Sequence, residues 1–191
     1  MTAREQEEYK ALRETIRERG TARIGIFVIG LLGWTGFVIA VLALALPPVA
    51  VILPLVWLAA AFEAVLALHV GVERVGRYLL VFHADAWENA AGAFGPVKGA
   101  PVVDPLFARF FFLAAVANMI PLLATTPIVQ ELVLVVGAHL VFGVRIGVAR
   151  MAVVRQRRVD TVRFEQLRRS KFERRNGEDG ENGEALNTET K

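Results

Sequence analysis

Long runs of apolar residues, almost free of charged side chains, occur four times along the chain. Each run has about 20 residues, and a helix of that length, rising 1.5 Å per residue, crosses a hydrocarbon core about 30 Å thick. The pattern therefore predicts four transmembrane helices. We place them at Ile24–Leu46, Val49–Val70, Leu106–Thr125 and Pro127–Ala149.

The segments between the runs group the predicted helices into two pairs. Short proline-containing turns at 47–48 and at 125–127 join the members of each pair, whereas residues 71–105 form a longer, charged connection. Short connections keep neighbouring helices antiparallel. The fold class that we expect is an all-α integral membrane protein, a four-helix bundle of two antiparallel transmembrane hairpins with further helices at the cytoplasmic face.

Basic residues alternate from one connection to the next. The segment before the first run, residues 71–105 and the segment after the last run carry Lys and Arg, whereas the two proline turns carry none. Because basic residues near the ends of spans stay on the cytoplasmic side, we expect both termini to be cytoplasmic. Arginine far outnumbers lysine, and Ala and Val are abundant. This usage favours a GC-rich bacterial genome and hence the bacterial inner (cell) membrane.

The charged segments outside the runs predict helices at the membrane surface. Residues 1–23 carry a narrow apolar seam of Tyr9, Leu12 and Ile16 at helical spacing. The apolar spacing over Gly71–Ala91 is typical of an amphipathic helix that lies flat in the membrane interface. The predicted organisation is a charged helix at 1–23, a hairpin at 24–70, an interfacial helix and loop at 71–105, a second hairpin at 106–149, a basic helix at 150–175 and a disordered acidic tail at 176–191.

The first run contains a stripe of small residues, which let membrane helices approach closely. The stripe indicates packing inside the protein's own bundle, with homodimerisation as the alternative. Trp34 lies on another side of the helix and is expected to face lipid or a partner. In the third run, Pro121 predicts a kink near Asn118. The stripe consists of Gly30, Gly33, Gly36, Ala40 and Ala43.

Four polar residues lie deep inside the predicted spans, where an unpaired charge costs a few kcal/mol or more. Glu63 and Arg145 have opposite charges at similar depths, which predicts an ion pair between the two hairpins. Asn118 and His139 lie near the middle of their spans and could form a hydrogen bond across a helix interface. A second hypothesis is that Glu63, Asn118 and His139 line a proton or ion path, tuned by Arg145.

Several kinds of site are not expected. The chain has no cysteine, so disulfides, thiolate metal sites and cysteine nucleophiles are excluded, and we expect no metal. Two histidines, His69 and His139, lie within predicted spans. Their depths differ by about 10–15 Å. The two axial ligands of one haem need similar depths, so we expect no haem and no other cofactor.

Residues 150–175 carry ten basic and three acidic side chains, a net charge of +7. A basic segment next to a span attracts anionic lipid headgroups at about 1 kcal/mol per residue. No aromatic stacking pattern accompanies the charge, so we do not expect nucleic-acid binding. The arginines expected to contact lipid are Arg150, Arg155, Arg157, Arg158, Arg163, Arg168 and Arg169.

Two classes of function remain open. The absence of catalytic motifs, the minimal outer surface and the small-residue stripe favour a non-enzymatic scaffold or accessory subunit. Such a subunit would form a homo-oligomer or bind another membrane protein. The alternative is a small ion-coupled transporter or channel subunit that uses Glu63, Asn118 and His139. An enzyme is not expected, because the polar residues supply no nucleophile with a neighbouring base.

Overall fold

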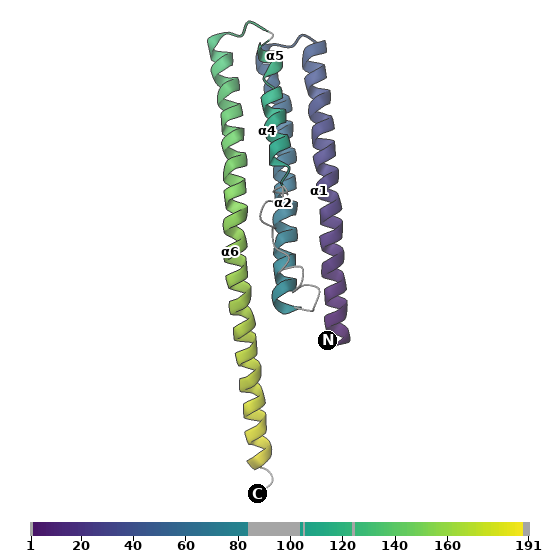
Figure 1. Ribbon diagram of the computed structural model, residues 1–191, viewed down its shortest axis with the longest axis vertical. Helices are drawn as coiled ribbons and strands as arrows, with labels where there is room; N and C mark the ends of the chain where they lie inside the picture. The colour runs from purple at the N-terminus through teal and green to yellow at the C-terminus, as the bar shows by residue number, and fades with distance from the viewer. Residues whose placement is uncertain (1, 84–103, 105, 124, 189–191) are drawn as a thin grey trace, which may run out of the picture.

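The computed structural model describes residues 2–83, 104, 106–123 and 125–188, and every regular element in this part of the chain is a helix. Three of the helices are long and apolar enough to cross a membrane. The all-helical fold and the presence of helices able to span a membrane were therefore predicted correctly from the sequence. The elements are α1 (Ala3–Ala43), the 3₁₀ turn η1 (Pro48–Val51), α2 (Ile52–Phe82), α4 (Ala108–Ala117), α5 (Ile120–Leu123) and α6 (Val129–Thr188) (Figure 1).

The long helices lie side by side, with α2 packed against both α1 and α6. Helix α2 is antiparallel to α1 and runs in the same direction as α6, whereas α4 runs in the opposite direction to α6 (Figure 1). Both chain termini therefore lie at one end of the molecule, which we call the terminal end. The opposite end, called the turn end, holds η1 and α5.

Helix α1 joins two segments that the sequence analysis treated separately. The Thr2 side chain caps the first turn and Glu5 reaches back to the Thr2 backbone, which completes a capping box. From there the helix continues without a break through the charged residues 3–23 into the apolar run. It ends at Ala43, and the left-handed φ of 47° at Ala45 closes the turn that follows.

Helix α2 extends beyond the apolar run to Phe82, so residues 71–82 do not form the separate interfacial helix expected over Gly71–Ala91. The apolar face that was expected to rest on lipid is covered by neighbouring helices instead, and Leu79 is fully buried. Residues 84–91 lie outside the part that the structure describes. The error has a physical cause: one amphipathic pattern suits both a membrane surface and a helix bundle.

The third apolar run forms two short helices, α4 and α5. The Asp104 carboxylate accepts hydrogen bonds from the backbone N–H groups of Leu106 and Arg109 and thereby caps the start of α4. Helix α4 ends at Ala117, where Pro121 cannot donate to the carbonyl four residues earlier. The kink predicted near Asn118 is therefore present as the break between α4 and α5.

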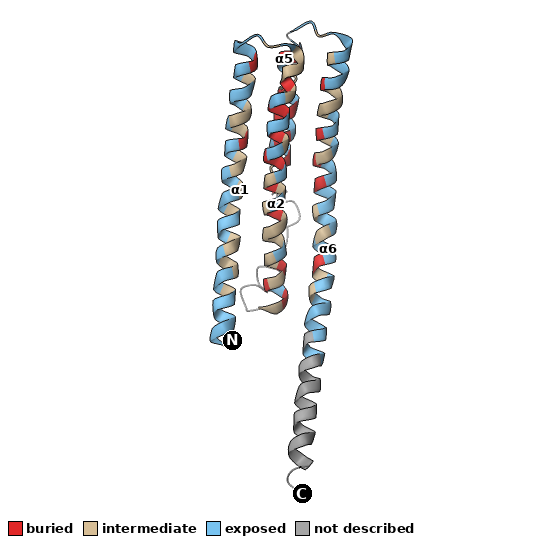
Figure 2. Cartoon of the chain, turned by 180° about the vertical axis from the view of Figure 1, so that it is seen from behind, coloured by how far each residue is buried: buried red, intermediate tan, exposed pale blue. Residues whose placement is uncertain are grey.

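The buried residues line the inward sides of the helices (Figure 2). The larger core cluster contains Phe62 of α2, Phe111 of α4 and Phe142 of α6, whose rings meet edge to face. A smaller cluster at the turn end contains Val51 and Val135. Many large apolar side chains on the outer surface are exposed, as expected of helices that face lipid.

The backbone of α6 is helical as far as Thr188. The acidic, apolar-poor composition of residues 176–191 predicts disorder. The described residues 176–188 of this segment continue α6.

Candidate functional site

The buried side chain of Asn118 joins three helices at the break between α4 and α5. Its Oδ1 accepts a hydrogen bond of 3.1 Å from Trp34 Nε1 of α1, and its Nδ2 donates one of 2.8 Å to the Val51 carbonyl. The same Nδ2 lies 3.1 Å from His139 Nε2 of α6. Asn118 is fully buried. The hydrogen bond that the sequence analysis considered between Asn118 and His139 is thus formed.

The hydrogen bonds of His139 identify its tautomer. Its Nδ1 lies 2.8 Å from the Val135 carbonyl oxygen, which can only accept, so Nδ1 carries the proton. Nε2 is then the acceptor for the Asn118 amide. Every hydrogen-bonding atom of the Asn118 side chain has a partner. We call Asn118, His139 and Trp34 the Asn118 cluster, and its hydrogen bonds hold α1, α4 and α6 together.

The structure corrects the expectation for Trp34. This side chain does not face lipid or a partner, because it is half-buried against the core and donates to Asn118. A helical projection shows which side of α1 the ring occupies. It does not show that the kinked α4 lies on that side.

The predicted ion pair between Glu63 and Arg145 is present, with 2.7 Å between Arg145 Nη2 and Glu63 Oε2. It joins α2 to α6. The two side chains are 47% and 41% exposed, respectively, so the pair lies at the surface of the bundle. Its surroundings therefore differ from those of the buried Asn118 cluster.

The four polar residues do not form one continuous path. Arg145 lies six residues beyond His139, which is about 9 Å along α6. The buried Phe142 lies between them and packs against Phe62. The hydrogen bonds of the described residues do not connect Glu63 to His139.

His69 and His139 are also far apart. Glu63 and Arg145 face each other, His69 lies six residues beyond Glu63 on α2, and His139 lies six residues before Arg145 on α6. Because the two helices are parallel, the histidines are separated by about 18 Å along the helix axes. His69 is buried, and its Nδ1 accepts a 3.0 Å hydrogen bond from Arg23 Nη1. The two rings therefore lie at different depths along the bundle.

The stripe of small residues in α1 divides into two parts. A Cβ added at Gly30 would lie 2.6 Å from the Ala61 Cβ, and one at Gly33 would lie 2.4 Å from Trp57 Nε1. These two glycines therefore allow α1 and α2 to pack closely, and Trp57 Nε1 donates to the Gly30 carbonyl at 3.0 Å. The remaining members of the stripe face outward: Gly36, Ala40 and Ala43.

Beyond the apolar runs, α1, α2 and α6 continue side by side toward the terminal end. We call residues 3–23, 71–82 and 150–170 the three-helix extension. A buried ion pair lies within it: Arg77 Nη2 of α2 donates to Asp160 Oδ2 of α6 at 3.0 Å, and the two residues are 8% and 5% exposed.

Further charged groups surround this pair. Arg77 Nη1 also donates to Glu73 at 2.9 Å, and Arg157 of α6 makes two hydrogen bonds of 3.2 Å to the same carboxylate. Gln156 donates to Asp160 at 3.1 Å. This network was not predicted from the sequence. Its only local signals were the Glu73–Arg77 spacing of four residues and one acid, Asp160, in a basic segment.

Aromatic side chains connect the same three helices. Tyr78 of α2 donates a 2.8 Å hydrogen bond to Glu8 of α1, and its ring lies 5.8 Å from that of Phe164 on α6. Arg168 donates to the Val81 carbonyl at 3.3 Å. The extension is therefore a packed bundle and not three separately solvated helices.

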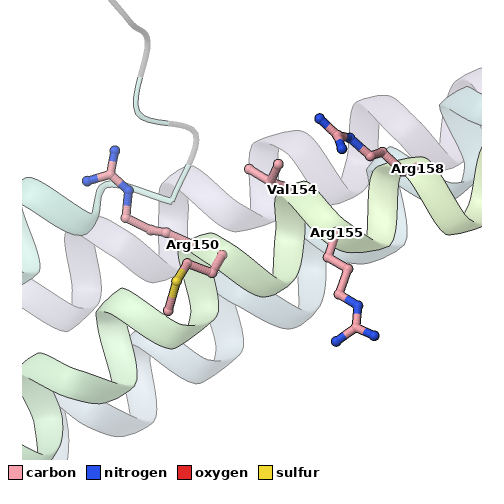
Figure 3. Close-up of a pocket in the computed structure, with 5 residues that line it drawn as sticks. Arg150, Val154, Arg155 and Arg158 are labelled. Atoms are coloured by element: carbon pink, nitrogen blue, oxygen red, sulfur yellow. The ribbon is translucent and has the colours of Figure 1, made fainter.

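The arginines predicted to contact lipid have two different environments. Arg157 and Arg168 make the contacts within the extension described above. Among the described residues, no ion pair involves the others: Arg150, Arg155, Arg158, Arg163 and Arg169. Three of these, with Met151 and Val154, line an open pocket on α6 (Figure 3). Arg150 and Arg158 project to one side of the helix there, and Arg155 projects to another.

Comparison of the chain with protein-family models, with curated proteins and with solved structures finds no match. The functional interpretation therefore depends on the residues and contacts of this chain.

Proposed function

We propose that this protein is a non-enzymatic membrane scaffold or accessory subunit, with four membrane crossings and both termini in the cytoplasm. The observation that carries the proposal is the three-helix extension. The buried Arg77–Asp160 pair and the Tyr78–Phe164 contact join α2 to α6, and the hydrogen bond from Tyr78 to Glu8 joins α2 to α1. Such an extension presents a fixed surface on which a partner can assemble.

The direction of the helices supports a fourth crossing. Helices α2 and α6 run in the same direction, so the chain between them must return from the terminal end to the turn end. The apolar segment Ala108–Leu123 provides about half of that return. Its length of about 24 Å is short for a span. The helix break at Asn118 is tolerable inside a membrane because the Asn118 side chain forms hydrogen bonds with the polar groups around it, including the Val51 carbonyl.

The charge distribution supports a cytoplasmic terminal end. Arg150, Arg155 and Arg158 lie within nine residues of the end of the last apolar run. At this distance we expect their side chains to reach lipid headgroups. In this position they attract anionic headgroups and hold α6 in its orientation. The lipid contact is thus part of the proposed scaffold role.

The arrangement favours this scaffold role over transport. A proton or ion path needs a continuous row of polar groups through the bundle. Between Glu63 and the cluster of Asn118, His139 and Trp34, the core is filled by the apolar rings of Phe62 and Phe142. The Asn118 cluster has no free hydrogen-bonding atom on the Asn118 amide with which to bind a substrate.

Native mass spectrometry of the protein released from its own membrane tests the proposal. We expect the chain to retain another copy or another polypeptide, together with anionic lipid. The variant Arg150→Gln/Arg155→Gln should lose bound anionic lipid. The control Arg163→Gln/Arg169→Gln removes the same charge about 20 Å farther from the apolar run and should retain the lipid.

The opposite result has a clear form. A monomer without any polypeptide partner, combined with ion flux into proteoliposomes that Glu63→Gln abolishes, would refute the scaffold role and establish transport.

A further inference from the structure

The exposed ion pair between Glu63 and Arg145 is unusual for its depth. Glu63 lies seven residues inside the end of the second apolar run, about 10 Å from the interface. Nearly half of each side chain remains exposed. Lipid tails offer neither hydrogen-bond donors nor acceptors, so a charged pair that faces them keeps a large desolvation cost.

The surface around the pair has the features of a helix interface. On α2, Ala60 and Ala67 are exposed small residues near Glu63, and on α6 Val141 and Val148 are 71% and 46% exposed near Arg145. Small residues allow a neighbouring helix to approach closely. The core side of α2 is different, because Phe62 is fully buried there against α4 and α6.

We propose that a second copy of this chain covers this surface, which we call the α2/α6 face. In the dimer a two-fold axis runs along the membrane normal, so that α2 of one copy lies opposite α6 of the other. Glu63 of each copy then meets Arg145 of its partner.

Charge complementarity identifies the occupant. The two members of the pair lie at one depth because they contact each other, and rotation about the membrane normal preserves depth. The rotation therefore places the Glu63 carboxylate of each copy opposite the Arg145 guanidinium of the other copy, at the same depth. The interface then contains two negative and two positive charges in alternation. A face that is complementary to itself in this way is what a two-fold interface requires. The proposal depends on neither the scaffold role nor the lipid contact.

The natural absence of cysteine makes the test simple. Ala60→Cys places one thiol on the α2/α6 face, and the control Leu113→Cys places one on an exposed position of α4. Each full-length variant is treated with a bismaleimide cross-linker in its own membrane, and the products are identified by mass. We expect Ala60→Cys to give a species of twice the chain mass, and Leu113→Cys to remain monomeric.

A charge-free variant extends the test. Glu63→Gln/Arg145→Met in the Ala60→Cys background should reduce the dimer yield at least tenfold, while thermal unfolding in detergent shows that the monomer remains folded. Cross-linking of Ala60→Cys that is no stronger than that of Leu113→Cys would overturn the proposal. Capture of a different polypeptide, or an unchanged dimer yield without the charges, would also overturn it.

Discussion

Replacing Asp160 with Asn should release the end of α2 from the three-helix extension. The Asp160 carboxylate is 5% exposed and accepts a 3.0 Å hydrogen bond from Arg77, which is 8% exposed. Asn preserves the shape of the side chain and removes its charge. Arg77 then remains buried with one carboxylate partner, Glu73, at 2.9 Å.

The expected magnitude follows from this geometry. Breaking a buried ion pair by removing one partner costs about 3–5 kcal/mol. Because Glu73 still compensates Arg77, the lower value of about 3 kcal/mol applies, and this corresponds to an increase of about 150-fold in the opening equilibrium.

Hydrogen exchange measures the opening directly. The backbone amides of residues 71–82 should exchange about 150-fold faster in Asp160→Asn than in the wild type, because their exchange rate follows the local opening equilibrium. Glu165→Gln is the matched control. It removes one exposed carboxylate from the same helix, and the described structure gives Glu165 no ion pair.

The reasoning would be refuted if Asp160→Asn and Glu165→Gln changed exchange equally. The extension would then depend on apolar contacts such as Tyr78 with Phe164. A third variant sharpens the test. Arg77→Met/Asp160→Leu replaces the pair with apolar groups and should recover most of the lost protection, because the uncompensated charge is gone.

Two further predictions concern packing inside the bundle. Gly30→Ala should lower the melting temperature in detergent, because the new Cβ would lie 2.6 Å from the Cβ of Ala61. The control Gly36→Ala should raise the melting temperature slightly, because no atom lies within 4 Å of the new Cβ and Ala favours a helix over Gly. Equal shifts for the two variants would contradict close packing of α1 on α2. Asn118→Leu should cost about 2–3 kcal/mol in thermal unfolding, since it leaves the His139 and Trp34 groups without their partner. An unchanged melting temperature would show that the cluster does not fasten the helices.

Some contacts could be predicted because position along a membrane helix gives depth. Glu63 and Arg145 were paired on that basis, and the structure places them in contact. Charges are scarce inside the apolar runs, so few alternative partners compete. The kink at Pro121 was predictable for a similar reason, because it depends on one residue and its own helix.

Contacts in the three-helix extension could not be predicted in this way. Charged residues are abundant there, so Arg77 had many possible partners and nothing in the pattern favoured Asp160. Trp34 was misplaced because its partner is fixed by a third helix. Residues 71–82 were misinterpreted because their apolar face suits a bundle as well as a membrane surface.

Because α6 is one continuous helix, a change in its tilt at one end displaces its other end. From Val129 to Ser170 the helix has 42 residues without a break, a length of about 63 Å. A tilt of about 10° at the turn end would move the far end sideways by about 11 Å, the diameter of one helix. A small change in the tilt of α6 at the turn end would thus move its terminal end by about the width of a helix.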